Sequence, residues 1–352
     1  MSLDTFERFG PLRSTPPLAV VNAVGGGESS WQADRLGSDG PFPNGGMWRV
    51  RQPGTHGASA VVKRTGPGHL GGDPVWAGAV DASDPQWWGR EAAFYTSDLA
   101  ATGWTDDCRA ARCLAIDDHD GVRDLWLEDV EIPLSAAEYE SAVRALAGWQ
   151  VHHRGEDRPW LSHGWIPAHL ARRDLDNTRT LNDPRWSRLF EAGVPQSVQR
   201  AVRGRVTDPA VVERLLGELP QLLTHYDFHH MNLGRVGESI VIIDWATVGP
   251  GPVGHDVGVM LIDQGSDLGA TLPAAWHQLV ATYAKALEDA GSEIPPPDVE
   301  RSVAISNVLR HGWVIDYVLG LSDQLSLESL CRLSPLLLHL AGLQRRYVHT
   351  EA

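Results

Sequence analysis

The spacing of apolar residues changes near residue 130 of this 352-residue chain. Before it, short apolar stretches bounded by turn residues predict β-strands at 48–51, 58–63 and 124–128. From Ser135 onward, apolar residues recur every three or four positions, and Ser135 and Asp208 are expected to cap helices. The pattern predicts an α+β fold, with a small β-rich lobe at 1–130 and a larger helical lobe at 131–352. The predicted helices span 136–151, 209–219, 273–290 and 325–347.

One apolar run in the helical half has the pattern of a buried strand. It spans 240–243 and ends at Asp244, while Asp227 and Asn232 lie upstream in a predicted loop. Phosphoryl transfer needs one carboxylate to orient the attacking hydroxyl. It also needs an amide oxygen and a second carboxylate to hold Mg²⁺ on the nucleotide phosphates. Asp227, Asn232 and Asp244 supply this set in order. Asp256, further on, is expected to cap a helix and to anchor the segment.

The same stretch resembles a known motif. His225-x-Asp227-x-x-x-x-Asn232, with His229 inside it, resembles the His-Gly-Asp-x-His-Pro-Gly-Asn loop of the aminoglycoside phosphotransferase and choline kinase superfamily. Ile243-Asp244-Trp245 resembles the Ile-Asp-Trp or Ile-Asp-Phe of that superfamily. Two positions depart from the motif, because Tyr226 replaces the usual Gly and His230-Met231 replaces the usual Pro-Gly.

The resemblance implies a bilobal, protein-kinase-like fold and a small-molecule kinase. Such an enzyme transfers the γ-phosphoryl group of ATP or GTP to a hydroxyl of a small acceptor. Asp227 is then the residue that positions and deprotonates this hydroxyl, His225 braces the loop, and His229 lies near the acceptor. Asn232 and Asp244 are then the ligands of Mg²⁺.

The first lobe is expected to supply the nucleotide site. Lys63 ends a predicted strand, from which its ammonium can reach the phosphates. Glu91 lies in Arg90-Glu91-Ala92, which resembles the start of the kinase helix whose Glu pairs with that Lys. A glycine-rich loop at 37–46 is expected to cover the phosphates. A linker at 125–130 is expected to meet the adenine ring with its main chain. The cofactor-binding residues predicted from these two segments are Ser38, Gly40, Glu128, Asp129 and Val130.

The acceptor is expected to bind to the helical lobe. Residues 307–317 are predicted to be helical, with Trp313, Asp316 and Tyr317 on about one face. Such a face offers an aromatic ring for stacking and a carboxylate for hydroxyl or amine groups. The alternative, in which Trp313 and Tyr317 are core residues and Asp316 is solvated, stays open.

Composition restricts the partners. The formal net charge of −15 disfavours nucleic acid and anionic membranes, and it suits either a cationic acceptor or a solvated acidic surface. No apolar run is long enough to cross a membrane, and residues 1–17 lack the apolar segment of a secretory signal. Three cysteines without a Cys-x-x-Cys pair are typical of a reducing cytoplasm. A cytoplasmic protein that binds a nucleoside triphosphate and a small hydroxylated molecule is expected, with no protein partner evident.

Two other functions fit some of these residues. A nucleotide-binding pseudokinase without activity is one alternative, although every group needed for transfer is present. A metal-dependent hydrolase is the other, but it leaves Asn232, Lys63 and Glu91 without a role. Its ligands would come from His225, Asp227, His229, His230, Asp244 and His255.

The sequence does not name the acceptor. Antibiotics, choline, amino sugars and nucleoside-type molecules are acceptors in the resembled superfamily. On that basis alone, modification of an antibiotic or another natural product is expected first, and with it antibiotic resistance by O-phosphorylation.

Overall fold

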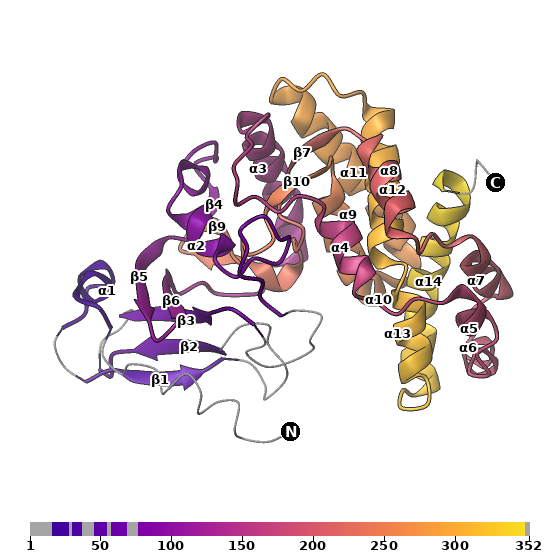
Figure 1. Cartoon of the computed structure of the whole chain (residues 1–352), viewed down its shortest axis with the longest axis horizontal. Helices are drawn as coiled ribbons and strands as arrows, with labels where there is room; N and C mark the ends of the chain where they lie inside the picture. Colours follow the sequence, from indigo (N-terminus) through magenta and orange to yellow (C-terminus); the bar gives the residue numbers. More distant parts are fainter. Residues whose placement is uncertain (1–15, 28–29, 37–45, 55–57, 69–76, 349–352) are drawn as a thin grey trace. The chain divides into compact units, whose positions relative to one another are not determined.

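The computed structural model of the protein describes residues 16–27, 30–36, 46–54, 58–68 and 77–348, which form two compact units (Figure 1). The first unit contains residues up to 134 together with 157–163 and 232–248. The second contains 135–156, 164–231 and 249 onward. The boundary at 134 is close to the one predicted at 130. The division at residue 130, however, assigned 157–163 and 232–248 to the second lobe.

The first unit is built on a five-stranded antiparallel sheet with the strand order β1-β2-β3-β6-β5. The three strands predicted from the sequence are confirmed, and they form the middle of the sheet as β2, β3 and β6. The outer strands carry no alternating pattern, because the β1 side chains are exposed and most β5 side chains are half-buried. The strands are β1 (Gln32–Arg35), β2 (Gly46–Arg51), β3 (Ser59–Thr65), β5 (Cys113–His119) and β6 (Val122–Glu128).

One face of this sheet packs against a short helix, α1 (Leu18–Ala23). Val20 of α1 joins Val50, Val62 and Trp126 of the sheet in one buried core. Burial of such apolar side chains contributes about 1.5–3 kcal/mol each. This core therefore fixes which residues of β3 and β6 point toward α1.

The opposite face packs against α2 (Arg90–Tyr95), where Ala92 lies against Leu125 of β6. Successive side chains of a strand point to opposite faces, so Lys63, the residue after Val62, is directed to the α2 face. The register agrees, because Lys63 pairs with Leu125. The helix that carries Glu91 thus covers the sheet face that carries Lys63.

A second, three-stranded sheet of the first unit has the order β4-β9-β8. β9 (Ser239–Ile242) confirms the strand predicted at 240–243; it pairs in parallel with β4 (Cys108–Ala110) and antiparallel with β8 (Leu233–Val236). A 3-10 turn, η4 (Asp98–Ala100), precedes β4. Because β4 belongs to the N-terminal part of the chain, its pairing with β9 joins residues 232–248 to the first unit.

The second unit is mainly helical, with one antiparallel strand pair, β7 (Gln221–Thr224) and β10 (Gly249–Pro252). The predicted helices are confirmed as α3, α8, α11 and α14. Both predicted caps are present: Ser135 forms a capping box, and Asp208 accepts a hydrogen bond from a main-chain N–H of α8.

The 3-10 turn η7 (His230–Asn232) lies where the chain passes back to the first unit. In the described part of the second unit the other helices are η5 (Ala136–Glu138), α3 (Tyr139–His152), α4 (Trp165–Ala171), α5 (Asn177–Leu181), α6 (Trp186–Glu191), α7 (Gln196–Ala201), η6 (Val202–Gly204), α8 (Pro209–Gly217), α9 (His255–Asp263), α10 (Gly265–Leu268), η8 (Gly269–Thr271), α11 (Leu272–Asp289), α12 (Pro296–His311), α13 (Val314–Leu321) and α14 (Leu327–Tyr347).

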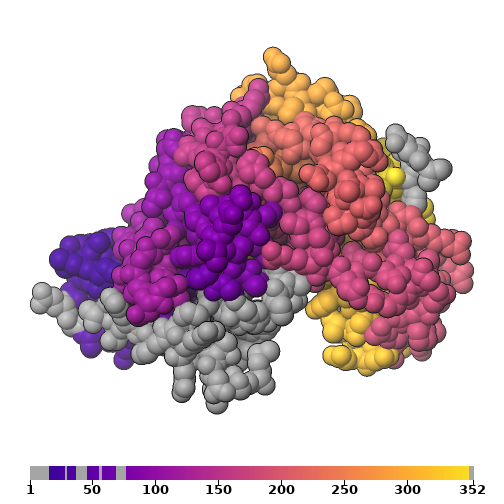
Figure 2. Space-filling view, in the orientation of Figure 1, coloured from indigo at the N-terminus to yellow at the C-terminus, as the bar shows by residue number. Residues whose placement is uncertain are grey.

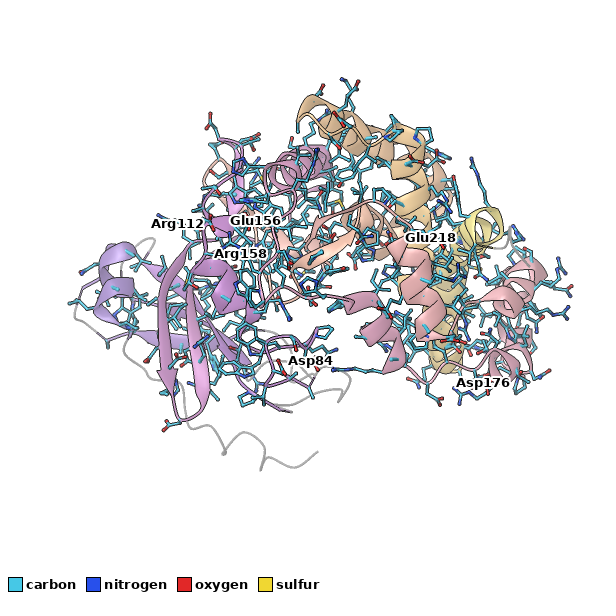
Figure 3. All side chains as sticks on the ribbon, turned by 45° about the horizontal axis from the view of Figure 1, so that its top comes forward. Asp84, Arg112, Glu156, Arg158, Asp176 and Glu218 are labelled. Carbon is cyan, nitrogen blue, oxygen red and sulfur yellow. The ribbon has the colours of Figure 1, made fainter. Side chains whose placement is uncertain are left out.

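The C-terminal helices of this unit pack against helices from its middle. Leu337 of α14 shares a buried core with Leu189 of α6 and Val198 of α7. The space-filling view shows the yellow C-terminal atoms beside the pink atoms of the segment that holds α5 to α7 (Figure 2). Asp176, labelled in Figure 3, starts that segment by accepting hydrogen bonds from two main-chain N–H groups of α5. Among the described residues, no helix combines the length and apolar content needed to cross a membrane.

Candidate active site

Lys63 lies at the centre of a buried charge cluster in the first unit. Its Nζ is 2.7 Å from Glu91 Oε2 and 2.7 Å from Asp244 Oδ1. The side chains of Lys63 and Glu91 are 6% and 1% exposed, while that of Asp244 is 32% exposed. The ion pair expected between Lys63 and Glu91 is therefore present, and β9 adds Asp244 as a further partner.

This cluster keeps Lys63 protonated. Burial by itself lowers the pKa of an ammonium group, but the charges of Asp244 and Glu91 outweigh burial and raise the pKa of Lys63 well above its ordinary value. Burial raises the pKa of the Glu91 carboxyl, and the charge of Lys63 opposes that rise. A compact ammonium fixed in this way can bind a phosphate oxygen as a point charge.

A β-hairpin brings Asn232 and Asp244 onto neighbouring backbones. β8 begins directly after Asn232, β9 ends shortly before Asp244, and Leu233 pairs with Ile242. The main-chain N–H of Ile243 donates a hydrogen bond of 3.0 Å to the carbonyl oxygen of Asn232. Asp244 has a φ of 63°, a left-handed conformation that is uncommon for residues other than glycine. Such strain is found most often at functional sites.

The donor chemistry of this hairpin fits Mg²⁺. An amide oxygen and a carboxylate are hard oxygen ligands, which Mg²⁺ prefers. Asn232 is buried and Asp244 is half-buried, so both offer oxygen atoms with restricted access to solvent. Asn232 and Asp244 are therefore the residues that could hold the ion.

A buried carboxylate fixes the loop that follows β7 in the second unit. Oδ2 of Asp256 accepts a hydrogen bond of 2.9 Å from the main-chain N–H of His225, and Oδ1 accepts one of 2.8 Å from that of Tyr226. Asp256 thus anchors the loop, as predicted. Its predicted role as a helix cap is wrong, because Gly254 is the N-cap of α9 and Asp256 lies in the first turn.

His225 and Tyr226 shape the loop from within. The main-chain N–H of Asp227 donates to Nδ1 of His225 at 3.2 Å, which supports a bracing role for His225. Tyr226 has a φ of 69°, which explains why glycine is usual at this position of the resembled motif. Tyrosine is accommodated here because its hydroxyl donates to the carbonyl oxygen of Pro250 at 2.6 Å and its ring stacks on Trp165.

Asp227 presents a partly exposed carboxylate. The side chain is 41% exposed, and Oδ2 is 3.5 Å from Nε2 of His229. Burial acts to raise the pKa of Asp227, but the hydrogen bond and charge of His229 and the charges of His225 and Arg310 lower it to about 2. Asp227 is therefore ionised at neutral pH and can accept a hydrogen bond from a hydroxyl group.

Arg310 is a charged neighbour of Asp227 that the sequence did not indicate. It is buried on α12, with Nη1 2.7 Å from Nε2 of His169 and the guanidinium 4.7 Å from the ring centre of Trp165. Burial lowers the pKa of Arg310 to about 9, and the charge of Asp227 opposes this. An arginine on a helix is usually exposed, so only the packing of α12 and α4 could reveal its position.

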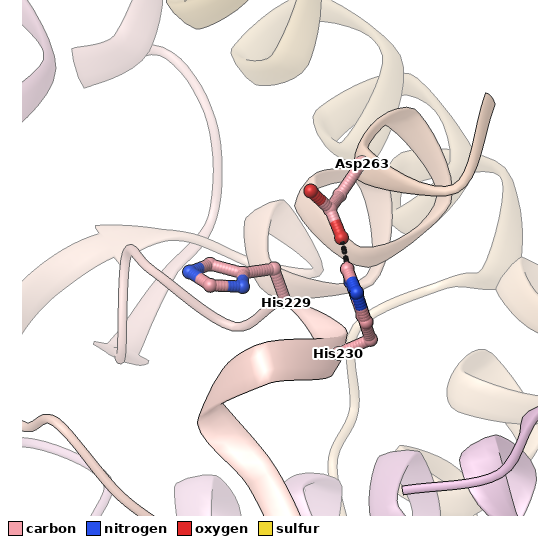
Figure 4. A group of neighbouring side chains, drawn as sticks. All are labelled: His229, His230 and Asp263. Atoms are coloured by element: carbon pink, nitrogen blue, oxygen red, sulfur yellow. Dashed lines mark hydrogen bonds and ion pairs between the residues drawn. The ribbon is translucent and has the colours of Figure 1, made fainter. Parts of the chain in front are cut away.

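Among the described residues, His229, His230 and Asp263 form a group of three His, Cys, Asp or Glu side chains close enough to share a metal ion (Figure 4). Their ligand atoms lie within 4.8 Å of one another. Nδ1 of His230 forms a short hydrogen bond with Oδ2 of Asp263, whereas the ring of His229 turns away from that pair. The pair of His230 and Asp263 therefore ties the loop to the last residue of α9, at the position where the resembled motif has proline.

Side-chain contacts within the first unit hold the predicted adenine linker. The Glu128 carboxylate accepts a hydrogen bond of 2.7 Å from the main-chain N–H of Arg112, which is labelled in Figure 3. It also pairs with the side chains of Arg109 and Arg112. Asp129 pairs with Arg49 at 2.9 Å. These contacts fix the course of the linker, while its contact with adenine stays a prediction.

Val130, Ser38 and Gly40 complete the predicted nucleotide site. Val130 is buried in a core with Ala111 and Val241. Ser38 and Gly40 lie outside the residues that the structure describes.

Four of the five residues predicted to meet the acceptor line a cavity of the second unit. Its volume is ≈ 350 Å³, and Trp313 and Tyr317 line it together with Asp227 and His229. The rings of Trp313 and Tyr317 contact each other, with centres 5.6 Å apart. Asp227 thus shares one cavity with two aromatic side chains of the predicted acceptor site.

Asp316 has other partners. Its carboxylate pairs with Arg205 and accepts a hydrogen bond of 2.5 Å from the hydroxyl of Thr180, and it is not among the residues that line this cavity. The helix predicted across 307–317 is also interrupted, because α12 ends at His311 and α13 begins at Val314.

A sequence profile of the phosphotransferase enzyme family matches residues 82–290, which is more than half of the chain. The chain belongs to this family. The matched part contains Glu91, Asp227, Asn232 and Asp244. The predicted enzyme class, a phosphotransferase with an alcohol group as acceptor, is confirmed.

Comparison with curated proteins finds no match to this phosphotransferase. Solved structures similar to it include an amicoumacin kinase bound to AMP-PNP and Ca²⁺. That similarity has 12% identity, covers 88% of each chain and has a TM-score of 0.49. Another is an ethanolamine kinase of Plasmodium vivax, with 12% identity, coverage of 88% of this chain and 82% of that chain, and a TM-score of 0.48.

Proposed function

We propose that this phosphotransferase transfers the γ-phosphoryl group of ATP or GTP to a hydroxyl of a small acceptor. The observation that carries the proposal is the ammonium of Lys63, held 2.7 Å from both Glu91 and Asp244. A buried, permanently charged ammonium next to a half-buried carboxylate serves a ligand that brings both phosphate oxygens and a metal ion. An ion pair that served only to stabilise the fold would need one carboxylate, whereas Lys63 contacts both Glu91 and Asp244.

The roles of the other residues follow from their chemistry. Asn232 and Asp244 would hold Mg²⁺, which neutralises charge on the nucleotide phosphates when bound. Lys63 would leave Asp244 in part to contact the phosphates, while Glu91 keeps it in place.

Asp227 would orient the acceptor hydroxyl. With a pKa of about 2, Asp227 is a weak base. We therefore assign to it mainly the positioning of the hydroxyl, with uptake of the proton late in the transfer, when the acceptor oxygen has become acidic. His225 would keep the loop in the conformation that presents this carboxylate.

A panel of hydroxylated acceptors tests the proposal. The panel includes aminoglycosides, choline, nucleosides and other natural products, each tried with ATP and with GTP. Release of ADP or GDP together with a phosphorylated product is expected for at least one acceptor. Antibiotic O-phosphorylation in the cytoplasm remains the first acceptor chemistry to try, on family grounds.

The same panel separates the two alternatives. A metal-dependent hydrolase would release products without consuming nucleotide, and a pseudokinase would bind nucleotide without transferring phosphate. If γ-³²P label stays in the nucleotide with every acceptor, both for ATP and for GTP, the kinase proposal is contradicted.

A further inference from the structure

The cavity that contains Asp227 is lined mainly by apolar side chains. Of its sixteen lining residues, ten are Val, Ile, Leu, Trp or Tyr. Those farthest from Asp227 in sequence come from the C-terminal helices and the loop between them, and include Leu321, Leu325 and Leu336. An acceptor that fills this space therefore removes apolar surface from water on most of its sides.

The charges around the cavity do not suit a ligand with several positive charges. Among the lining residues the acids are Asp227 and Asp263, and Asp263 is already paired with His230. Arg310 lines the cavity as well. The guanidinium of Arg173 lies over the ring of Trp313, 4.4 Å from its centre. A polycationic acceptor would meet only these two carboxylates, each already beside a histidine, and would be repelled by arginine charge.

We infer that the acceptor is an amphipathic alcohol with no net positive charge. It would place a hydroxyl at Asp227 and its apolar body against Trp313, Tyr317 and the leucines of the α13–α14 region. This inference rests on the proposed function for the identity of the reacting group. The preference for apolar ligands rests on the cavity alone, so the two can fail separately. It also assigns the net charge of −15 to the outer surface rather than to a cationic acceptor.

Direct binding of three probes tests the inference by calorimetry on the full chain with AMP-PNP and Mg²⁺. Octyl β-D-glucoside and methyl β-D-glucoside carry the same sugar hydroxyls and differ only in apolar length. Kanamycin A is a polycationic amino sugar. Octyl glucoside is expected to bind about tenfold or more tightly than methyl glucoside, and kanamycin A more weakly than either.

Matched variants locate the binding. Tyr317 is 56% exposed and lines the cavity, whereas Leu338, 40% exposed on α14, does not. Both can be replaced with little risk to folding. Tyr317→Ala is expected to weaken octyl glucoside about threefold or more, and Leu338→Ala to leave it unchanged. Tyr317→Asp is expected to weaken octyl glucoside and to strengthen kanamycin A.

Two binding results would overturn the inference. One is tighter binding of kanamycin A than of octyl glucoside to the wild-type protein. The other is an equal effect of Tyr317→Ala and Leu338→Ala, which would show adventitious binding to exposed apolar surface. Phosphorylation of kanamycin A would refute the inference and keep the proposed function. If the expected binding pattern is seen but no acceptor in the panel is phosphorylated, the inference is kept and the proposed function is refuted.

Discussion

The two groups of predicted catalytic residues are held in place in different ways. In the first unit, Lys63, Glu91 and Asp244 are bonded to one another through their side chains. In the second unit, the loop that carries Asp227 is held through its main chain, because Asp256 accepts hydrogen bonds from two backbone N–H groups. Asp227 itself keeps a partly exposed carboxylate.

This difference predicts that substitutions in the first group affect stability and activity together, whereas a substitution at Asp227 affects mainly activity. Removal of one charge from a buried ion pair leaves the remaining charge without compensation, which costs about 3–5 kcal/mol. Changes in the first unit should therefore lower both stability and activity. A change at Asp227 leaves the main-chain hydrogen bonds of the loop in place, so it should lower activity far more than stability.

The largest expected effect compares Asp244 with Asp227. Asp244→Ala removes a proposed metal ligand, so it should abolish turnover and weaken binding of the Mg²⁺–nucleotide complex. Asp227→Asn should keep nucleotide binding and most of the thermal stability while kcat falls by about 10²-fold or more. Calorimetry with AMP-PNP and steady-state kinetics measure both. If Asp227→Asn loses nucleotide binding and Asp244→Ala keeps it, the roles assigned to the two residues are reversed.

Lys63→Ala tests whether the charges of Lys63, Glu91 and Asp244 hold this group together. It should lower kcat/KM for nucleotide by about 10²-fold and lower the free energy of unfolding by about 3–5 kcal/mol, because Glu91 stays buried. Chemical denaturation and initial rates measure these effects. Lys285→Ala is the control, since Lys285 is exposed and pairs with Glu288 and Asp289 of its own helix. Wild-type activity in Lys63→Ala would remove the first unit from the mechanism.

Asp256→Asn tests whether the main chain positions Asp227. An amide has only one oxygen to accept the N–H groups of His225 and Tyr226, so the variant should lose about 1–3 kcal/mol of stability. It should also lower kcat, while the KM for nucleotide stays constant. Equal changes in kcat and in the nucleotide KM would show that Asp256 supports the fold at large rather than this loop.

Tyr226→Phe should have the smallest effect. It removes the hydrogen bond to the carbonyl oxygen of Pro250, worth about 0.5–1.5 kcal/mol, and keeps the ring that stacks on Trp165. Thermal unfolding measures the loss. Tyr317→Phe, at a more exposed tyrosine, serves as the comparison. A loss in Tyr226→Phe no larger than in Tyr317→Phe would mean that the hydroxyl does not help to hold the left-handed backbone at this position.

The sequence was sufficient where chemistry and local periodicity carry the information. Alternation and three-to-four spacing located the central strands β2, β3 and β6 and the helices α3, α8, α11 and α14, because burial of one face leaves a regular trace in the chain. The order of His225, Asp227, Asn232 and Asp244 indicated phosphoryl transfer, because each residue type matches one chemical task.

Tertiary structure alone decided features that depend on partners far away in the chain. The pairing of β9 with β4 put Asp244 in the first unit. Packing buried Arg310, and it turned Asp316 toward Arg205 instead of into the cavity. The apolar lining around Asp227 also comes from several separate helices. Local spacing records which face of a helix or strand is buried, but not which distant residue meets that face, since that choice is made only when the elements pack together.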